Sequence, residues 1–217
     1  MKNMPRIFIG DNAQNGMIIP LPRETAHYLT HVMRTKNAIV FGGGNEFNAT
    51  LDDTQKNIII GENTGHTDPS GDITLYFAPI KRTDDLINMA TQLGVKKIVP
   101  VITEHTNAPH INWERMKKIA VEAAEQSNRN SVPEIATPIK FADLDLSKIT
   151  FADERAAYGK EQPTTTKIKS ILVGPEGGFS DAEFTELDKA GAIGISLGKT
   201  ILRAELAAAI AISRINK

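Results

Sequence analysis

From Asp72 to the carboxyl terminus, short apolar stretches of strand length alternate with longer segments of helical periodicity. The pattern predicts strands at residues 73–80, 97–102, 149–152, 170–173 and 192–197, and helices at residues 84–93, 113–127, 180–191 and 203–215. Strands that alternate with helices are typical of a parallel sheet covered by helices. This part of the chain is therefore expected to adopt an α/β fold.

Local signals mark the ends of two of these helices. Ser180 followed by Glu183 forms a capping box that predicts a helix start, and Gly191 predicts its end. Thr83 is expected to cap the helix at residues 84–93, and Gly94 is expected to end it.

The first seventy residues have a different pattern. Short apolar stretches predict strands at residues 6–9, 38–41 and 57–60, separated by turns rich in Asp, Asn and Gly. One helix is expected at residues 24–33, with Leu29, Val32 and Met33 facing inward. Residues 61–71 are polar and resemble a linker. We therefore expect a β-rich first domain at residues 1–70 and an α/β second domain at residues 72–217.

The composition excludes several kinds of site. There is no cysteine among the 217 residues, which excludes disulfides, thiolate metal sites and cysteine nucleophiles, and we expect no metal. No apolar run is long enough to cross a membrane, and the first ten residues do not resemble a secretory signal. We expect a soluble, cytoplasmic protein with no membrane partner. The formal net charge of −1 means that any nucleic-acid surface must be local to one face.

Two glycine-bearing loops follow predicted strands. The first, Gly174-Pro175-Glu176-Gly177-Gly178, lies where a parallel sheet binds ligands, although a tight loop that merely needs glycine is an equally good interpretation. The second, Leu197-Gly198-Lys199-Thr200, is not a P-loop, because the required glycine five residues earlier is Ile193. The dinucleotide fingerprint and the Gly-x-Ser-x-Gly elbow of hydrolases are also absent.

Several basic and polar residues are candidates for contact with RNA. They are Arg6, Arg23, His27, His31 and Arg34 in the first domain, and Gln126 and Arg129 near the end of the helix at residues 113–127. A cation near a helix carboxyl terminus is also favourable by itself, so Arg129 has a structural alternative. Arg203 stands at the expected start of the last helix, where the helix dipole disfavours a cation, and this placement suggests a functional role.

Four blocks of sequence together resemble one family. They are QLGVKKIVPV (92–101), EAAEQSNRNSVP (122–133), GPEGGFS (174–180) and SLGKTILRAE (196–205). The chain resembles the bacterial 16S ribosomal RNA (uracil(1498)-N(3))-methyltransferases of the SPOUT superfamily, and PRIFIG (5–10) and HYLTHVMR (27–34) fit that family's amino-terminal PUA-like RNA-binding barrel. The resemblance implies a deep trefoil knot in the second domain, S-adenosylmethionine as cofactor, and a homodimer.

The resemblance also implies site residues. The residues expected to bind the cofactor are Ile102, Thr103, Glu104, Val173, Gly174, Pro175, Glu176, Gly177, Gly178, Leu197, Gly198, Ile201, Leu202 and Arg203. Relatives usually carry Glu where Gln92 stands, Arg at His105, and Thr at Ala204 and Leu206.

The expected reaction methylates N3 of a uridine in the 16S ribosomal RNA of the assembled small subunit. Arg203 is expected to stabilise the charge that develops on the uracil, and Glu205, or less favourably Glu176, to accept its proton. Two alternatives stay open: a non-catalytic RNA-binding factor for ribosome assembly, and the same chemistry on a different RNA.

Overall fold

The computed structural model of the chain describes residues 4–68, 71–107, 111–164 and 166–215. The chain divides into two compact units: unit 1 contains Met1–Pro69 and Ala124–Val132, and unit 2 contains Ser70–Ala123 and Pro133–Lys217. The division after residue 69 falls inside the stretch 61–71 that resembles a linker, but residues 61–63 complete a strand. Residues 124–132 belong to unit 1, although the sequence pattern assigns them to the second domain.

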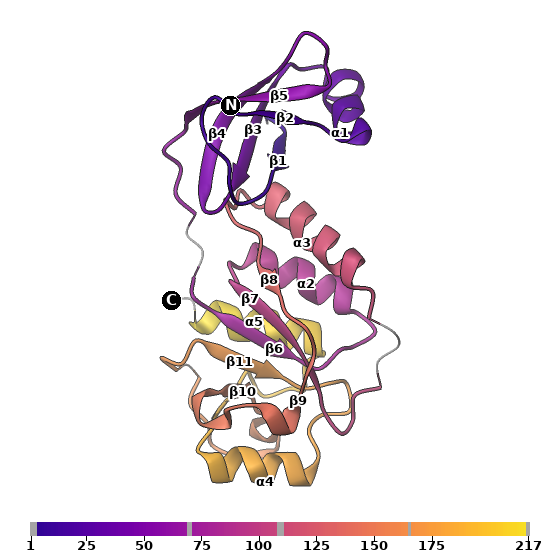
Figure 1. Ribbon diagram of the computed structural model, residues 1–217. Coiled ribbons are helices and arrows are strands. Elements are labelled where there is room, and N and C mark those ends of the chain that lie inside the picture. The colour runs from indigo at the N-terminus through magenta and orange to yellow at the C-terminus, as the bar shows by residue number, and fades with distance from the viewer. Residues whose placement is uncertain (1–3, 69–70, 108–110, 165, 216–217) are drawn as a thin grey trace. The chain divides into compact units, whose positions relative to one another are not determined.

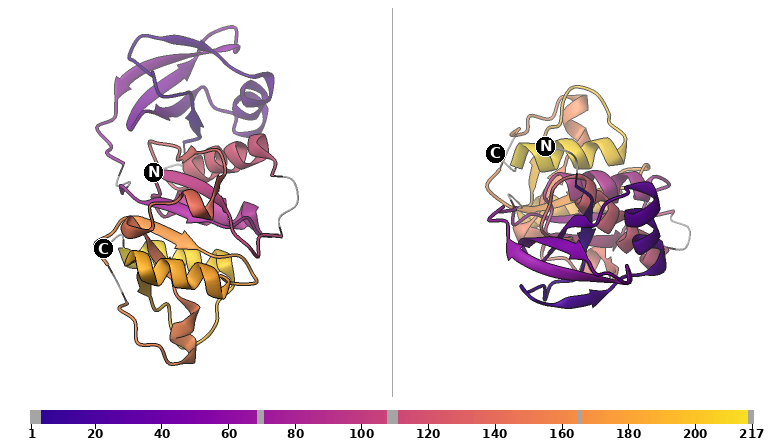
Figure 2. Two further views of the ribbon diagram at one scale, coloured as in Figure 1. Left: turned by 60° about the horizontal axis from the view of Figure 1, so that its bottom comes forward. Right: turned by 90° about the horizontal axis from the view of Figure 1, so that it is seen from above.

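Unit 1 contains a curved five-stranded sheet in the order β1-β3-β4-β5-β2 (Figures 1 and 2). Its strands are β1 (Arg6–Phe8), β2 (Ile18–Pro20), β3 (Asn37–Gly42), β4 (Asn45–Leu51) and β5 (Asn57–Asn63). β1 pairs with β3 in parallel, and the other neighbours are antiparallel. The sequence pattern predicts β1, β3 and β5 but misses β2 and β4, since β4 carries two asparagines and β2 ends in a proline that only an edge strand tolerates.

The helix expected at residues 24–33 is only partly a regular α-helix. α1 (Arg23–His27) continues into the π-helical turn η1 (Tyr28–Val32), in which the Met33 N–H donates to the Tyr28 carbonyl at 2.9 Å. Leu29 is buried as expected, but the prediction for Val32 is wrong, because its side chain is 61% exposed. A π turn has one residue more than an α turn, and it rotates the residues that follow away from the face that regular periodicity predicts.

The described residues of unit 2 form seven strands, all paired in parallel, which confirms the α/β prediction. The strands are β6 (Thr74–Phe77), β7 (Lys97–Ile102), β8 (Glu134–Ile135), β9 (Ile139–Lys140), β10 (Thr150–Ala152), β11 (Ser170–Val173) and β12 (Ile193–Ile195). The order is β12-β10-β11-β6-β7-β8, and β9 pairs with β7 beyond β8. β11 therefore lies between β10 and β6 in the middle of the sheet.

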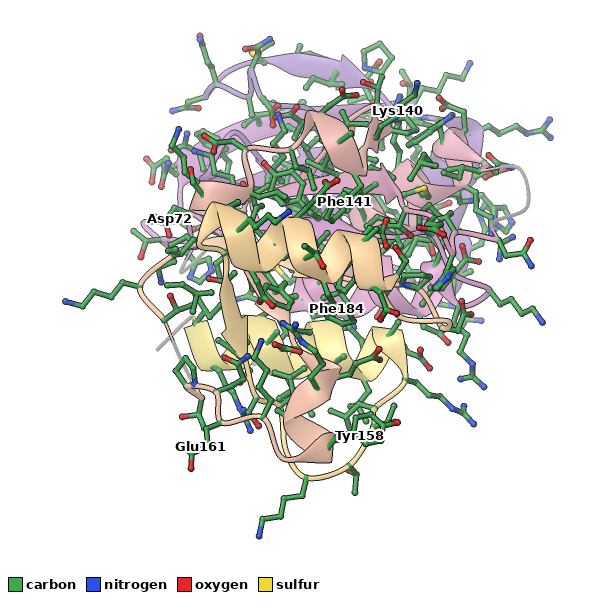
Figure 3. All side chains as sticks on the ribbon, turned by 90° about the horizontal axis from the view of Figure 1, so that it is seen from below. Asp72, Lys140, Phe141, Tyr158, Glu161 and Phe184 are labelled. Atoms are coloured by element: carbon green, nitrogen blue, oxygen red, sulfur yellow. The ribbon has the colours of Figure 1, made fainter. Side chains whose placement is uncertain are left out.

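Helices cover both faces of this sheet. They are α2 (Thr83–Gln92), α3 (Trp113–Gln126), α4 (Asp181–Ala190) and α5 (Ala204–Ile215), with the short turns η2 (Phe141–Asp143), η3 (Leu146–Lys148) and η4 (Glu154–Tyr158). α5 packs on β10, β11 and α2. Phe184 of α4 packs with Phe141, Phe151 and Leu172 on the opposite face (Figure 3). Because side chains alternate along a strand, the neighbours of Leu172 in β11 point toward α5.

The capping box at the start of α4 is confirmed. The Ser180 hydroxyl accepts from the Glu183 N–H at 3.3 Å, the Glu183 carboxylate accepts from the Ser180 N–H at 2.9 Å, and Gly191 ends the helix with φ +76°. The predicted cap of α2 is wrong. Thr83 is the first helical residue, and its hydroxyl donates to the Ile80 carbonyl in the preceding turn.

Candidate active site

A cavity of about 290 Å³ lies in unit 2 where β10 and β11 end. Three segments line it, within residues 152–157, 173–179 and 197–207. The first two directly follow β10 and β11, and the third follows β12, the other neighbour of β10. The cavity is thus at the carboxyl edge of a parallel sheet, which is the usual ligand-binding edge of such folds.

The glycine loop at residues 174–178 forms one wall of the cavity. Gly178 has φ +70°, and its N–H donates to the Pro175 carbonyl at 3.0 Å to close a turn. A Cβ atom at Gly178 would lie 2.3 Å from Oε1 of Glu154, a flexible side chain that could move aside, so it is the positive φ that favours glycine here.

His105, in the segment after β7, supports this loop from outside the cavity. Its Nδ1 lies 3.2 Å from the carbonyl oxygens of both Gly177 and Gly178. A carbonyl oxygen can only accept, so Nδ1 carries a proton and donates in these contacts. On the same loop, the Glu176 carboxylate accepts from the backbone N–H of Lys81 at 3.1 Å.

The second loop is held by the last helix. The Arg214 guanidinium of α5 donates to the carbonyl oxygens of Ser196 and Leu197, the second at 3.2 Å. Gly198 has φ +146°, and a side chain there would project into open space at the cavity wall. Arg203 also lines the cavity; it directly precedes α5, its side chain is exposed, and no described residue forms an ion pair with it.

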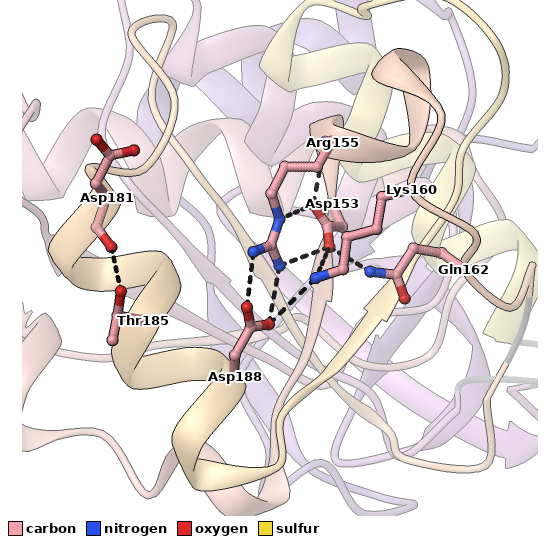
Figure 4. Close-up of polar contacts among 7 residues, drawn as sticks. All are labelled: Asp153, Arg155, Lys160, Gln162, Asp181, Thr185 and Asp188. Atoms are coloured by element: carbon pink, nitrogen blue, oxygen red, sulfur yellow. Dashed lines mark hydrogen bonds and ion pairs between the residues drawn. The ribbon is translucent and has the colours of Figure 1, made fainter.

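The third wall begins with Asp153, whose side chain is fully buried. Asp153 accepts from Arg155 through Nε and a terminal nitrogen, both at 2.8 Å, and from Gln162 at 2.5 Å (Figure 4). Arg155 also binds Asp188 of α4 at 2.8 Å and 3.0 Å. This hydrogen bonding lowers the pKa of Asp188 to about 2 and raises the pKa of Arg155. The network fixes the backbone at the end of β10.

Glu154 follows Asp153 and lines the cavity. Partial burial of its carboxyl group raises the pKa, the neighbouring charge of Asp153 raises it further, and the charges of Arg155 and His105 oppose the shift. This segment is not predicted from the sequence. The available signal is an acidic pair directly after a buried strand, at the same sheet edge as the glycine loop.

The predicted cofactor residues fall into two groups. All of them line the cavity except Ile102, Thr103, Glu104 and Gly177. β7, which carries Ile102, is separated from β11 by β6, and this distance keeps its carboxyl end out of the cavity between β10 and β11. The backbone N–H of Glu104 instead donates to the Glu183 carboxylate at 2.9 Å. The loop after β7 therefore supports the site from outside, because Glu104 contacts α4 and His105 contacts the glycine loop.

The two carboxylates considered as proton acceptors differ in their surroundings. Glu176 lines the cavity together with Arg203. Glu205 does not line it; its side chain is 10% exposed, and its Oε1 lies 3.8 Å from Nε of Arg82.

Two of the predicted RNA-contacting arginines pair with carboxylates in unit 1: Arg129 is buried, and the Arg6 side chain is 11% exposed. Arg6 forms an ion pair with Glu46 and donates to the Arg129 carbonyl at 2.7 Å. Arg129 lies 3.7 Å from Asp68, and both side chains are 5% exposed. Burial lowers the pKa of Arg129, and the charge of Asp68 opposes that shift. These contacts tie residues 124–132 to the sheet of unit 1.

The remaining predicted RNA-contacting residues are exposed: Arg23, His27, His31, Arg34 and Gln126. The rings of His27 and His31, one helical turn apart, stack with centroids 4.5 Å apart. Within the described ranges, no helix is long and apolar enough to cross a membrane. No cluster of three or more potential metal ligands occurs in the same part of the chain.

Residues 66–216 match the family model of the RNA methyltransferase domain. Over 97% of its length the chain is 35% identical to ribosomal RNA small subunit methyltransferase E from Rickettsia conorii, and it covers 94% of that protein. The chain belongs to this methyltransferase family. The protein of the same name from Buchnera aphidicola (strain APS) is 30% identical, with 98% of the chain and 92% of the relative covered.

Solved structures of family members agree with this assignment. The methyltransferase E from Neisseria gonorrhoeae, solved with bound S-adenosylmethionine, superimposes with a TM-score of 0.79 at 28% identity and covers 97% of this chain and 96% of its own. A probable rRNA-methyltransferase from Porphyromonas gingivalis gives a TM-score of 0.79 at 27% identity, with the same coverage. The agreement over nearly the full length includes both units.

Proposed function

We propose that the protein uses S-adenosylmethionine, bound in the cavity of unit 2, to methylate N3 of a uridine in 16S ribosomal RNA. The equivalent of uridine 1498 in the assembled small subunit is the proposed target, and the cytoplasm the proposed location. The observation that carries this proposal is the cavity itself. Three segments line it, and two of them carry glycines, which leave room for a ligand next to the backbone. The chain also belongs to a methyltransferase family.

The cavity fits the proposed cofactor in size and chemistry. Its volume is at the small end of the range for small-molecule sites, and most of its lining is apolar or glycine. The residues proposed to hold the cofactor are Asp153, Glu154, Val173, Gly174, Pro175, Glu176, Gly178, Leu197, Gly198, Ile201, Leu202 and Arg203. When bound, the cofactor supplies a methyl group that its positive sulfonium already activates.

The protein's own task is to prepare the acceptor base. The N3 atom of uracil carries a proton and lies on the pairing edge, so the base must be turned out of its helix to react. As the proton leaves N3, negative charge spreads onto the two carbonyl oxygens, and the exposed guanidinium of Arg203 at the cavity can stabilise it. We assign the proton to Glu176 rather than Glu205, because Glu176 shares the cavity with Arg203 and Glu205 is paired with Arg82.

We also propose the fold type of each unit and the oligomeric state, on the basis of the family resemblance. Unit 1 is proposed to be a PUA-like barrel that binds RNA through its exposed residues Arg23, His27, His31, Arg34 and Gln126, and unit 2 a SPOUT domain with a deep trefoil knot. A homodimer is also proposed. Ala208 and Ala211 of α5 are buried within the chain, so they cannot pack against a second copy. The exposed apolar side chains of Ile201 and Leu206 beside the cavity are better candidates to pack against a second copy.

The test is mass mapping of modified nucleosides in ribosomal RNA from a strain that lacks the protein. We expect one 3-methyluridine to be missing from 16S ribosomal RNA, to return with the wild-type chain, and not to return with Arg203→Ala. Lys189→Ala, an exposed cation at the end of α4, is the control that restores it. Unchanged modification would favour a non-catalytic assembly factor, and a change confined to transfer RNA would favour a different target.

A further inference from the structure

Three carboxylates line the cavity: Asp153, Glu154 and Glu176. Asp153 is neutralised by Arg155 and also accepts from Gln162. Glu176 accepts from the backbone N–H of Lys81. Glu154 is different, because its carboxylate makes no hydrogen bond or ion pair with any residue that the structure describes. Within the described chain it is the one lining carboxylate without a hydrogen bond or ion pair, and the charges of Arg155 and His105 act on it only through space.

The backbone next to Glu154 is anchored, whereas its exposed side chain makes no hydrogen bond within the described residues. Asp153 caps the turn η4 by accepting from the Arg155 N–H at 3.1 Å, and Arg155 is in turn fixed to Asp188 (Figure 4). On the cavity side, the Glu154 carboxylate lies against Gly178, where even a Cβ atom would collide with it. The backbone is thus anchored behind Glu154, and the glycine loop leaves room in front of it.

A carboxylate in this position affects ligands according to their charge. Partial burial and the neighbouring Asp153 raise the pKa of Glu154, against the opposing charges of Arg155 and His105, so a further positive charge on a ligand would favour the anion. Physiological salt screens charges over roughly 8 Å, so a charge on a ligand that lies closer than this to Glu154 interacts with its carboxylate. Glu154 lines the cavity and is therefore placed to interact with a charged ligand bound there.

We propose that the carboxylate of Glu154 attracts the positive charge of the cofactor, so that the cavity binds S-adenosylmethionine more tightly than its demethylated product. This inference rests on the proposed function. The methyl donor carries a positive sulfonium, whereas the product, S-adenosylhomocysteine, has a neutral thioether at the same atom and is otherwise alike. Attraction to Glu154 is lost when the methyl group leaves, which favours release of the product and renewed binding of the donor.

Calorimetric titration of the full-length protein with each of the two ligands tests this role. Glu154→Gln keeps the shape and removes the charge. In Glu154→Gln, we expect the affinity for S-adenosylmethionine relative to that for S-adenosylhomocysteine to fall by about tenfold. This is the size of one charge interaction in a partly solvated site. Glu161→Gln, an exposed carboxylate in the same segment (Figure 3), is the control that keeps the wild-type ratio. Thermal denaturation should give matched midpoints for all three proteins.

The outcomes separate the inference from the proposed function. If both ligands bind the wild-type protein and Glu154→Gln leaves the ratio of their affinities unchanged, Glu154 does not distinguish the two ligands by charge, and the proposed function stands. An equal loss of affinity for both ligands also overturns the inference, since it would show a hydrogen bond to a part that the ligands share. Wild-type protein that binds neither ligand would overturn both proposals.

Discussion

Two arginines of unit 1 and one of unit 2 have opposite environments. In unit 1, the side chains of Arg6 and Arg129 are only 11% and 5% exposed, and each has a carboxylate partner, Glu46 and Asp68 respectively. In unit 2, Arg203 is exposed at the cavity, and no ion pair to it occurs within the described residues. A buried guanidinium has lost its water and depends on its partner, whereas an exposed one keeps its charge available for a ligand. The first kind holds a fold together, and the second kind suits chemistry.

The largest effect is expected from breaking a buried pair in unit 1. Asp68→Ala removes the partner of Arg129 and leaves a desolvated cation, which should lower the free energy of unfolding by about 3 to 5 kcal/mol. Urea denaturation followed by circular dichroism measures this loss. Asp53→Ala is the matched control, because Asp53 is fully exposed and 3.8 Å from an exposed Lys36. A loss as small as that of the control would show that the buried pair does not secure residues 124–132.

The second prediction concerns Arg203, where stability and rate should separate. Arg203→Ala should reduce the single-turnover methylation rate by about 10²- to 10³-fold, the usual cost of one preorganised donor. Cofactor affinity should fall much less, because the interaction matures only as the uracil proton leaves. The melting temperature should stay within the range of a surface substitution. A variant that unfolds early and loses its cofactor, but turns over normally when folded, would identify Arg203 as structural.

Sequence reasoning predicts the framework of unit 2 well, since its signals are local. The periodicity of buried strands and the Ser180–Glu183 box identify their elements because each depends on residues close together in the chain. The same reasoning fails for Val32, where a π turn shifts the face, and for β4, whose asparagines hide a strand that its neighbours stabilise.

The candidate site is predictable only where the motif itself touches the cavity. The two glycine loops carry their signal in sequence, and both line the cavity. The segment at Glu154 carries only an acidic pair after a buried strand, and its place at the cavity depends on the strand order that brings β10 beside β11. The burial of Arg6 and Arg129 is likewise invisible in sequence. Arg6 is far from Glu46 in the chain, and Arg129 is far from Asp68. Only the folded unit brings each arginine to its carboxylate partner.

The third prediction compares an exposed arginine of unit 1 with the buried ones. If Arg23 contacts a phosphate, Arg23→Ala should reduce the slope of log affinity against log salt by about 0.7 to 0.9. Binding to small ribosomal subunits across a series of salt concentrations measures this slope. Lys189→Ala, an exposed cation of α4, should leave it unchanged. An unchanged slope for Arg23→Ala would remove α1 from the proposed RNA surface.

The smallest effect is expected at the partly exposed pair that supports the cavity wall. Arg155 holds the pKa of Asp188 down to about 2, below the value of about 3.9 in an unfolded chain. The folded state therefore binds fewer protons at this site, so the pair stabilises the fold above about pH 4 and its contribution is lost as the pH falls toward 2. The Asp188 side chain is 49% exposed, and solvent screening limits the contribution to about 1 kcal/mol or less.

Asp188→Asn should therefore be less stable than the wild type by that amount at pH 7 and pH 5, and the difference should shrink as the pH falls below 4. Urea denaturation at pH 7, 5, 3.5 and 2.5 gives the four differences in unfolding free energy. Glu186→Gln, an exposed carboxylate on the same helix, corrects for the change in net charge. A difference that grows on acidification would reverse the sign of the linkage, and would mean that Asp188 is held to the wall by a group that requires its protonated form. If the difference in unfolding free energy is the same at all four pH values, the contact between Arg155 and Asp188 does not stabilise the fold through charge. The contrast between arginines paired with a carboxylate and Arg203, which is unpaired within the described residues, would then not extend to the cavity wall.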